Sequence, residues 1–206
     1  LKRITEAQNA LSKVYTDPNS QIERILGAIT EFEKLFGEER EVFLLSVPGR
    51  SEILGNHTDH NRGKVLAAAI DLDILAIASP TDDGTVTVKS EGFPEDVVDF
   101  ATYTSPVEAE FGTSASIIAG MCAGFLKEGY AIGGFDAYTT SNVLKGSGLS
   151  SSAAFEDMIG NILSHMYNDG KVDNVEIAKL SQYAENKFFG KPCGLMDQVA
   201  CAVGGI

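Results

Sequence analysis

The first forty residues carry apolar side chains at helical spacing. This periodicity predicts two helices, over residues 4–15 and 20–36. Asn19 or Ser20 is expected to cap the second helix, and Gly37 to end it. The segment is therefore expected to be a helical extension in front of the domain that follows.

Short apolar or alternating runs further along the chain predict β-strands. Strands are expected at residues 42–47, 74–78, 85–89, 97–100 and 135–142. The dipeptide Pro48-Gly49 should stop the first strand. The run Asp82-Asp83-Gly84 is typical of a hairpin turn, so it predicts that the second and third strands pair.

Three further segments are predicted to be helical, at residues 113–128, 151–167 and 174–188. Helices and strands therefore interleave along the chain without a strict βαβ period. Such an order favours an α+β fold over a doubly wound parallel sheet.

The composition limits the size, location and partners of the protein. Its 206 residues, 44% of them apolar and 22% charged, suffice for one good-sized globular domain or two small ones. No apolar run approaches the roughly 18 residues of a membrane span, and the start has no signal-peptide pattern. Three cysteines without a CxxC pair argue against a disulfide framework, so we expect a cytoplasmic protein.

The charge balance disfavours one class of partner. The net charge is −13, with 16 basic residues, 29 acidic residues and no basic run. A nucleic-acid surface neutralises phosphates with Lys and Arg, so no nucleic-acid partner is expected. A nucleotide is not excluded, because it arrives with Mg²⁺ and binds backbone N–H groups.

A glycine- and serine-rich segment, Leu144-Lys-Gly-Ser-Gly-Leu-Ser-Ser-Ser-Ala153, lies between a predicted strand and a predicted helix. Glycines permit tight curvature, and the free N–H groups of a helix start favour an anion. The segment is therefore a candidate phosphate cradle, although it does not fit a Walker A loop. A glycine turn followed by serine caps is an equally weighted alternative.

A polar segment follows the first predicted strand, at residues 48–61. It holds Arg50, Glu52, Asn56, His57, Asp59 and His60. So many donors and acceptors suit the hydroxyls of a sugar, whereas an ordinary surface loop is the alternative. The spacing of its histidines and acids fits no standard zinc pattern.

A third segment covers residues 184–198. Glu185 lies near the end of one predicted helix, and Asp197 begins another after Gly194. A carboxylate at a helix start is commonly only a cap, so this segment alone decides nothing.

Taken together, the three segments resemble a known family. The patterns GRxxxxGxHTD at 50–59, GxGLSSSA at 146–153 and CGxMDQ at 193–198 occur in the order found in the galactokinase branch of the GHMP small-molecule kinases. The resemblance implies an N-terminal domain at 41–206, with helices packed on a mixed sheet, preceded by the helical extension at 1–40. The family's C-terminal domain would be absent, so we expect a piece of an enzyme about twice as long.

The resemblance also implies roles for single residues. The loop around the ATP phosphates falls on Gly146, Ser147, Gly148, Leu149, Ser150, Ser151 and Ser152. Ser152 and Glu185 match the positions that hold Mg²⁺, the one cofactor expected. Asp197 matches the catalytic aspartate, and Arg50 the arginine beside it.

Sugar recognition is implied for four further positions, which are Asn56, His57, Asp59 and Gly194. Three residues depart from the family pattern: Asn56 replaces a Glu, His60 replaces a Tyr, and Leu144 replaces a frequent Pro. The chain also lacks Trp, which the family commonly packs beside adenine. The core chemistry is therefore expected to be intact, while recognition of the sugar and the base is altered.

The function implied is transfer of the γ-phosphoryl group of ATP to a sugar, with the anomeric hydroxyl of galactose as the expected acceptor. A kinase for arabinose or an amino sugar is one alternative. A sensor that binds sugar and ATP without turnover is another, although the intact serine run argues against it. The oligomeric state is left open.

Overall fold

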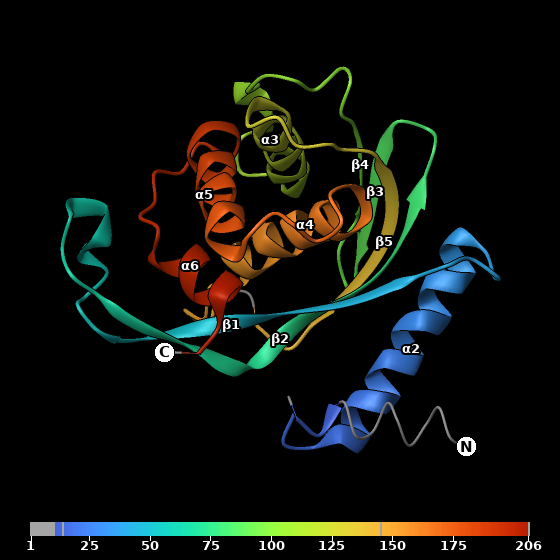
Figure 1. Ribbon diagram of the computed structural model, residues 1–206, viewed down its shortest axis with the longest axis horizontal. Helices are drawn as coiled ribbons and strands as arrows, with labels where there is room; N and C mark the ends of the chain where they lie inside the picture. Colours follow the sequence, from blue (N-terminus) through green and yellow to red (C-terminus); the bar gives the residue numbers. More distant parts are fainter. Residues whose placement is uncertain (1–10, 14, 145, 206) are drawn as a thin grey trace.

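The computed structural model describes residues 11–13, 15–144 and 146–205. Most of the helix predicted over 4–15 lies outside these residues. The remaining elements form a five-stranded sheet with helices on both of its faces (Figure 1).

The sheet is mixed and its strand order is β1-β2-β5-β3-β4. The strands are β1 (Phe43–Leu54), β2 (Leu66–Thr81), β3 (Thr85–Ser90), β4 (Glu95–Asp99) and β5 (Gly134–Ser141). Strand β5 runs parallel to β3, and the other neighbouring strands are antiparallel. The predicted α+β fold with a mixed sheet is confirmed, and the strand predicted near residue 97 is β4, at one edge of the sheet.

The predicted hairpin between the second and third strands is wrong. The chain does reverse between β2 and β3, but β5 lies between them and pairs with both. Gly134 makes this insertion feasible: a Cβ there would lie 2.5 Å from Thr81 Oγ1 and 2.7 Å from the Thr85 carbonyl oxygen. Turn residues indicate a reversal of the chain, whereas pairing partners depend on contacts distant in sequence.

The predicted end of the first strand at Pro48-Gly49 is also wrong. Strand β1 continues to Leu54, with a shift of register between Pro48 and Arg50. Proline is tolerated because β1 is an edge strand, with no partner on one side. A Cβ on Gly49 would lie 2.7 Å from the Leu149 carbonyl oxygen, so glycine lets β1 pass close to the serine-rich loop.

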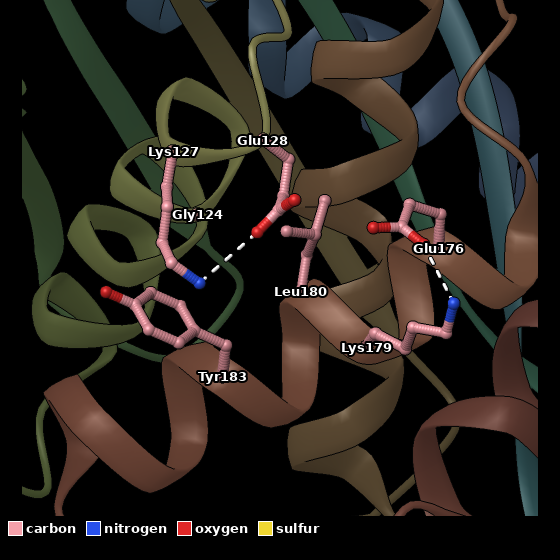
Figure 2. Close-up of a pocket in the computed structure, with 7 residues that line it drawn as sticks. All are labelled: Gly124, Lys127, Glu128, Glu176, Lys179, Leu180 and Tyr183. Atoms are coloured by element: carbon pink, nitrogen blue, oxygen red, sulfur yellow. Dashed lines mark hydrogen bonds and ion pairs between the residues drawn. The ribbon is translucent and has the colours of Figure 1, made fainter.

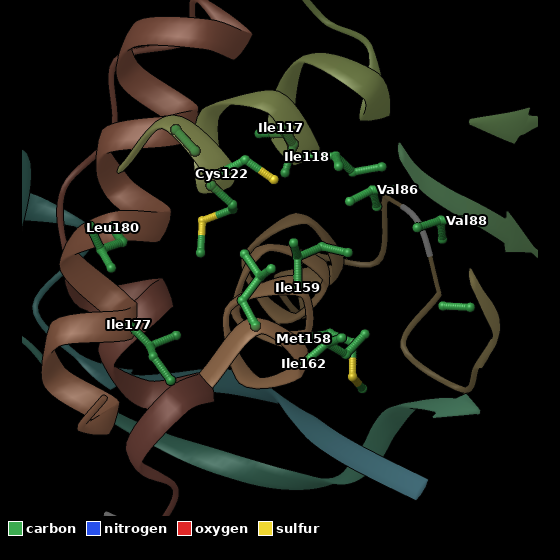
Figure 3. Close-up of a cluster of buried hydrophobic side chains, with 14 of the residues drawn as sticks. Val86, Val88, Ile117, Ile118, Cys122, Met158, Ile159, Ile162, Ile177 and Leu180 are labelled. Carbon is green, nitrogen blue, oxygen red and sulfur yellow. The ribbon is translucent and has the colours of Figure 1, made fainter. Parts of the chain in front are cut away.

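One face of the sheet carries most of the core. The helices are α2 (Pro18–Phe36), α3 (Ser114–Lys127), α4 (Ser151–Tyr167), α5 (Asn174–Ala184) and α6 (Met196–Val203), and a π-helical turn, Glu185–Phe189, continues α5. Val86 and Val88 of β3 pack with Ile118 of α3 and with Met158 and Ile159 of α4 (Figure 3). This packing fixes α4, and with it the serine-rich loop at the start of α4, against the sheet.

Helix α2 covers the opposite face (Figure 1). Along β2, Ile74 and Ala76 face the main core, while Leu75 and Ile77 pack with Phe32 of α2. The alternation follows from the two-residue period of a strand. Both faces of β2 are therefore buried over residues 73–79.

The start of α2 differs from the prediction in its cap. Asp17, and not Asn19 or Ser20, is the N-cap, and its carboxylate accepts hydrogen bonds from the backbone N–H groups of both predicted residues. Pro18 then occupies the first turn, which suits its fixed φ and missing N–H. In the described part of the chain, none of the helices is both long enough and apolar enough to cross a membrane.

Candidate active site

An arginine from the edge strand and an aspartate from α6 form the centre of the site. Arg50 Nε lies 2.8 Å from Asp197 Oδ1, and Arg50 Nη2 lies 2.8 Å from Asp197 Oδ2. This bidentate geometry is strong and directional. Arg50 is only 4% exposed, and its guanidinium is permanently charged. Its two hydrogen bonds to Asp197 hold the pair in a fixed position.

The serine-rich loop closes on the same pair. Arg50 Nη1 donates to the Gly148 carbonyl oxygen over 2.6 Å, and the Arg50 backbone N–H donates to the Leu149 carbonyl oxygen over 3.1 Å. Ser150 Oγ donates to Asp197 Oδ2 over 2.6 Å. One guanidinium therefore joins the predicted catalytic residue to the predicted phosphate loop.

The loop geometry agrees with a phosphate cradle at a helix start. Gly146 and Gly148 have φ angles of +78° and +76°, a region that favours glycine. Ser150 is the N-cap of the 17-residue helix α4 and has a φ of +59°. Ser151 opens the helix, and Ser152 follows as an exposed side chain.

The environment of Asp197 favours its charged form. Burial acts to raise the pKa of this carboxyl, but the hydrogen bonds from Arg50 and Ser150 outweigh burial. The pKa of Asp197 consequently lies below its usual range. A carboxylate that stays ionised at neutral pH is able to accept a proton or orient a hydroxyl.

His57 lies against the same pair. Its Nε2 is 3.0 Å from Arg50 Nη2, and its Nδ1 is 3.8 Å from Asp197 Oδ1. A guanidinium nitrogen only donates, so Nε2 is the acceptor and we assign the ring proton to Nδ1. The backbone N–H of His57 donates to Glu52 Oε1 over 2.8 Å.

Two other predicted sugar-binding residues meet each other. A Cβ on Gly194 would lie 1.8 Å from Asp59 Oδ2, so only glycine leaves room for that carboxylate. The same oxygen accepts the Met196 backbone N–H over 2.9 Å. Asn56, by contrast, is exposed, and its side chain forms no hydrogen bond with any described residue.

Glu185 lies deeper, in the π-helical turn, and is 3% exposed. Its Oε1 accepts from Lys191 Nζ over 3.1 Å, and its Oε2 accepts from Gln198 Nε2 over 2.8 Å. Gln198 Nε2 also donates to Glu156 Oε2 over 3.1 Å. Residues in such turns frequently serve functional sites.

Gln198 and Glu156 were missed as supports of Glu185. Gln198 stands inside the CGxMDQ pattern, and Glu156 is one of two buried acids in a helix whose other inward residues are mostly apolar. Burial and the neighbouring Glu185 raise the pKa of Glu156 well above its usual range. The acid at position 156 can be read from the sequence, but its hydrogen-bond partner Gln198 cannot.

The donor set of Ser152 and Glu185 fits a magnesium ion in kind. A hydroxyl and a carboxylate are hard oxygen ligands, and the Lys191 ammonium already contacts Oε1 of Glu185. No hydrogen bond joins Ser152 to Glu185 in the described chain, and no cluster of three or more His, Cys, Asp or Glu side chains forms a metal site there. Further ligands would have to be phosphate oxygens and water.

A cavity of about 320 Å³ lies elsewhere, between α3 and α5 (Figure 2). It is lined by charged side chains, among them the ion pairs Lys127–Glu128 and Lys179–Glu176. None of the predicted site residues lines it. The predicted Arg50–Asp197 pair lies elsewhere, where β1, α4 and α6 meet.

A glycine–serine loop at the start of a long helix, closed on an Arg–Asp pair beside a mixed sheet, defines the N-terminal domain of a small-molecule kinase. Residues 116–205 match the family described as GHMP kinases N terminal domain. Residues 30–80 match the galactokinase galactose-binding signature. The chain belongs to the galactokinase branch of the GHMP kinase family.

Curated relatives agree with this membership. The chain is 37% identical over 175 residues to a galactokinase of Clostridium tetani, which covers 84% of this chain and 44% of that protein. It is 33% identical over 174 residues to a galactokinase of Bacillus subtilis, again covering 84% of this chain and 44% of the relative. The chain thus spans somewhat less than half the length of these relatives.

Solved structures show the same fold. A crystal structure of Lactococcus lactis galactokinase complexed with galactose has a TM-score of 0.79 and 31% identity, covering 87% of this chain and 47% of that one. A mevalonate kinase from Methanococcus jannaschii has a TM-score of 0.66 at 17% identity and covers 80% of this chain and 52% of that one. The second likeness bears on the fold alone.

Proposed function

We propose that the whole protein phosphorylates a monosaccharide with ATP, and that the acceptor is the anomeric hydroxyl of galactose. The observation that carries the proposal is Asp197, which accepts hydrogen bonds from Arg50 and Ser150. These contacts lie where the proposed phosphate loop (146–152) meets the polar segment at 48–61, here called the sugar loop. Phosphoryl transfer needs mainly positioning and charge stabilisation, and this arrangement supports both.

In this mechanism Asp197 orients the attacking hydroxyl and accepts its proton. General-base help of this kind is typically worth about 10²–10⁴ in rate. Arg50 keeps Asp197 ionised and offsets negative charge on the transferring group. The ATP phosphates lie on the loop from Gly146 to Ser152, at the N-terminus of α4, where the helix dipole favours anions.

Ser152 and Glu185 would hold Mg²⁺, which supplies charge neutralisation to the phosphates when bound. The chain's own contribution is to fix Glu185 through Gln198. His57, Asp59, Gly194 and Asn56 are proposed to contact the sugar. Residues 41–206 would form one half of the enzyme, with a C-terminal domain as partner and 1–40 as the extension, and the three free thiols support a cytosolic location.

A kinase for another sugar is the second candidate. The observation that favours it is Asn56, an exposed amide at a position where galactokinases carry a carboxylate. An amide still accepts a hydrogen bond but lacks the charge, so the preferred hydroxyl pattern would change.

The test is Mg·ATP-dependent ADP formation by the full-length protein with galactose, arabinose, N-acetylgalactosamine, glucose and mannose. Turnover selective for galactose is expected. Asp197→Asn should abolish most turnover while leaving nucleotide binding intact, because it removes the acceptor charge but not the loop. Turnover with a different sugar would move the substrate, and no turnover with any sugar would overturn the proposal.

A further inference from the structure

Glu52 is the one charged residue of the sugar loop that the proposed mechanism does not use. It lies on β1 two positions after Arg50, so strand alternation puts both side chains on the same face of the sheet. Its carboxylate is 19% exposed and therefore reaches the surface of the site without being freely solvated.

One oxygen of Glu52 holds a strained turn. Asn56 and His57 have φ angles of +53° and +51°, a left-handed conformation that is unfavourable for a non-glycine residue. Oε1 of Glu52 accepts the His57 backbone N–H over 2.8 Å. Glu52 thus fixes the turn that carries His57 to the Arg50–Asp197 pair.

The second carboxylate oxygen of Glu52 accepts no hydrogen bond from any described residue. Oε2 of Glu52 lies 4.0 Å from His57 Nε2, beyond hydrogen-bond distance. That nitrogen moreover accepts from Arg50, so it carries no proton to give. Among the described residues no other hydrogen bond or ion pair to Glu52 is formed, so Oε2 has no partner within the described protein.

We propose that Glu52 determines sugar specificity: its Oε2 accepts a hydrogen bond from a sugar hydroxyl. This inference rests on the proposed function and deepens it. Position 56 is an asparagine and supplies no carboxylate, so the proposal assigns the sugar-binding carboxylate to Glu52 of β1 instead. Carboxylates only accept, and hydrogen bonds to them are roughly twice as strong as neutral ones. Glu52 therefore favours a sugar that carries a hydroxyl group within hydrogen-bond distance of its Oε2.

The decisive variant is Glu52→Gln in the full-length protein. Glutamine keeps an oxygen for the His57 N–H and removes the charge, so a purely structural Glu52 would tolerate it. We expect the KM for the sugar to rise about tenfold, as for loss of a hydrogen bond to a charged group, with the KM for ATP unchanged. Glu41→Gln, an exposed acid just before β1, is the matched control and should leave both constants unchanged.

A series of monodeoxy sugars identifies the hydroxyl. One analogue should be penalised with the native protein and lose that penalty in Glu52→Gln, which is the coupling expected of a direct contact. A sugar KM in Glu52→Gln equal to that of the native protein, or equal rises in the KM for sugar and for ATP, would overturn the inference. If the native protein forms no ADP with any sugar, the proposed function fails instead; sugar binding measured by calorimetry then still tests Glu52.

Discussion

Ser150 contacts Asp197 directly, with its hydroxyl 2.6 Å from Oδ2, although the two residues lie on different helices. A residue of the phosphate loop therefore helps to set the protonation of the proposed catalytic carboxylate. This hydrogen bond therefore joins the proposed phosphate loop to the proposed catalytic residue.

The first prediction concerns that hydrogen bond. The pKa of Asp197 is lowered in the folded protein, so the ionised form persists until the pH falls through that low value. Ser150→Gly removes the hydroxyl while accepting the left-handed φ, which should raise this pKa. The acid limb of the kcat/KM profile should then move to higher pH, with about a tenfold loss of activity at neutral pH. An unmoved acid limb would show that Ser150 does not tune Asp197.

The second prediction concerns Arg50. Lysine is a point charge and cannot bond both oxygens of Asp197 while also reaching the Gly148 carbonyl. Arg50→Lys should lower kcat about 100-fold or more, because one residue supplies both positioning and charge. Rapid-quench turnover measures the step. Arg62→Lys, at an exposed arginine just after the sugar loop, is the control and should retain activity.

A third prediction follows from the contact between Gly194 and Asp59. Gly194→Ala places a Cβ 1.8 Å from Asp59 Oδ2, so the carboxylate must shift. The KM for the sugar should rise while ATP affinity is retained. Gly27→Ala in α2 is the control, because a Cβ there meets nothing within 4 Å and should stabilise the protein by roughly 0.5–1 kcal/mol. A normal sugar KM in Gly194→Ala would remove Asp59 from sugar binding.

How much of this could be read from the sequence depends on the range of each signal. Helical periodicity located 20–36 and 151–167, because core contacts repeat every turn. The turn at Asp82-Asp83-Gly84 was found, but the strand that enters beside it begins at Gly134, fifty residues later. Nothing in a local turn signal reports such a partner.

In the candidate site, too, local features could be predicted from the sequence, whereas contacts between distant residues could not. The contact between Arg50 and Asp197 joins residues 147 positions apart and was expected only through the family resemblance. The hydrogen bond from the His57 N–H to Glu52 spans only five positions. It nevertheless depends on the left-handed backbone of Asn56 and His57, which no sequence pattern predicted. The role of Gln198 between Glu156 and Glu185 required three elements to be placed together.

A fourth prediction concerns stability and pH. The pKa of Glu156 is raised in the folded state, mainly by burial, so the folded protein holds a proton that the unfolded chain has released. Stability should then fall as the pH rises above the usual range of a glutamate. Glu156→Gln keeps an acceptor for Gln198 and should gain stability relative to the native protein at pH 8 compared with pH 5, measured by urea unfolding. Glu33→Gln, exposed on α2, should show no such difference.

The position of β5 has a consequence for the order of assembly. The strand pairs β1–β2 and β3–β4 are each close in sequence, whereas the strand that unites them is synthesised last of the five. Until residues 134–141 leave the ribosome, the strand that pairs with both β2 and β3 is missing. Their union is a late, non-local step, and such steps are slow and prone to aggregation. The proposed phosphate loop follows β5 directly in the sequence, so its contacts with Arg50 of β1 also come after the synthesis of β5.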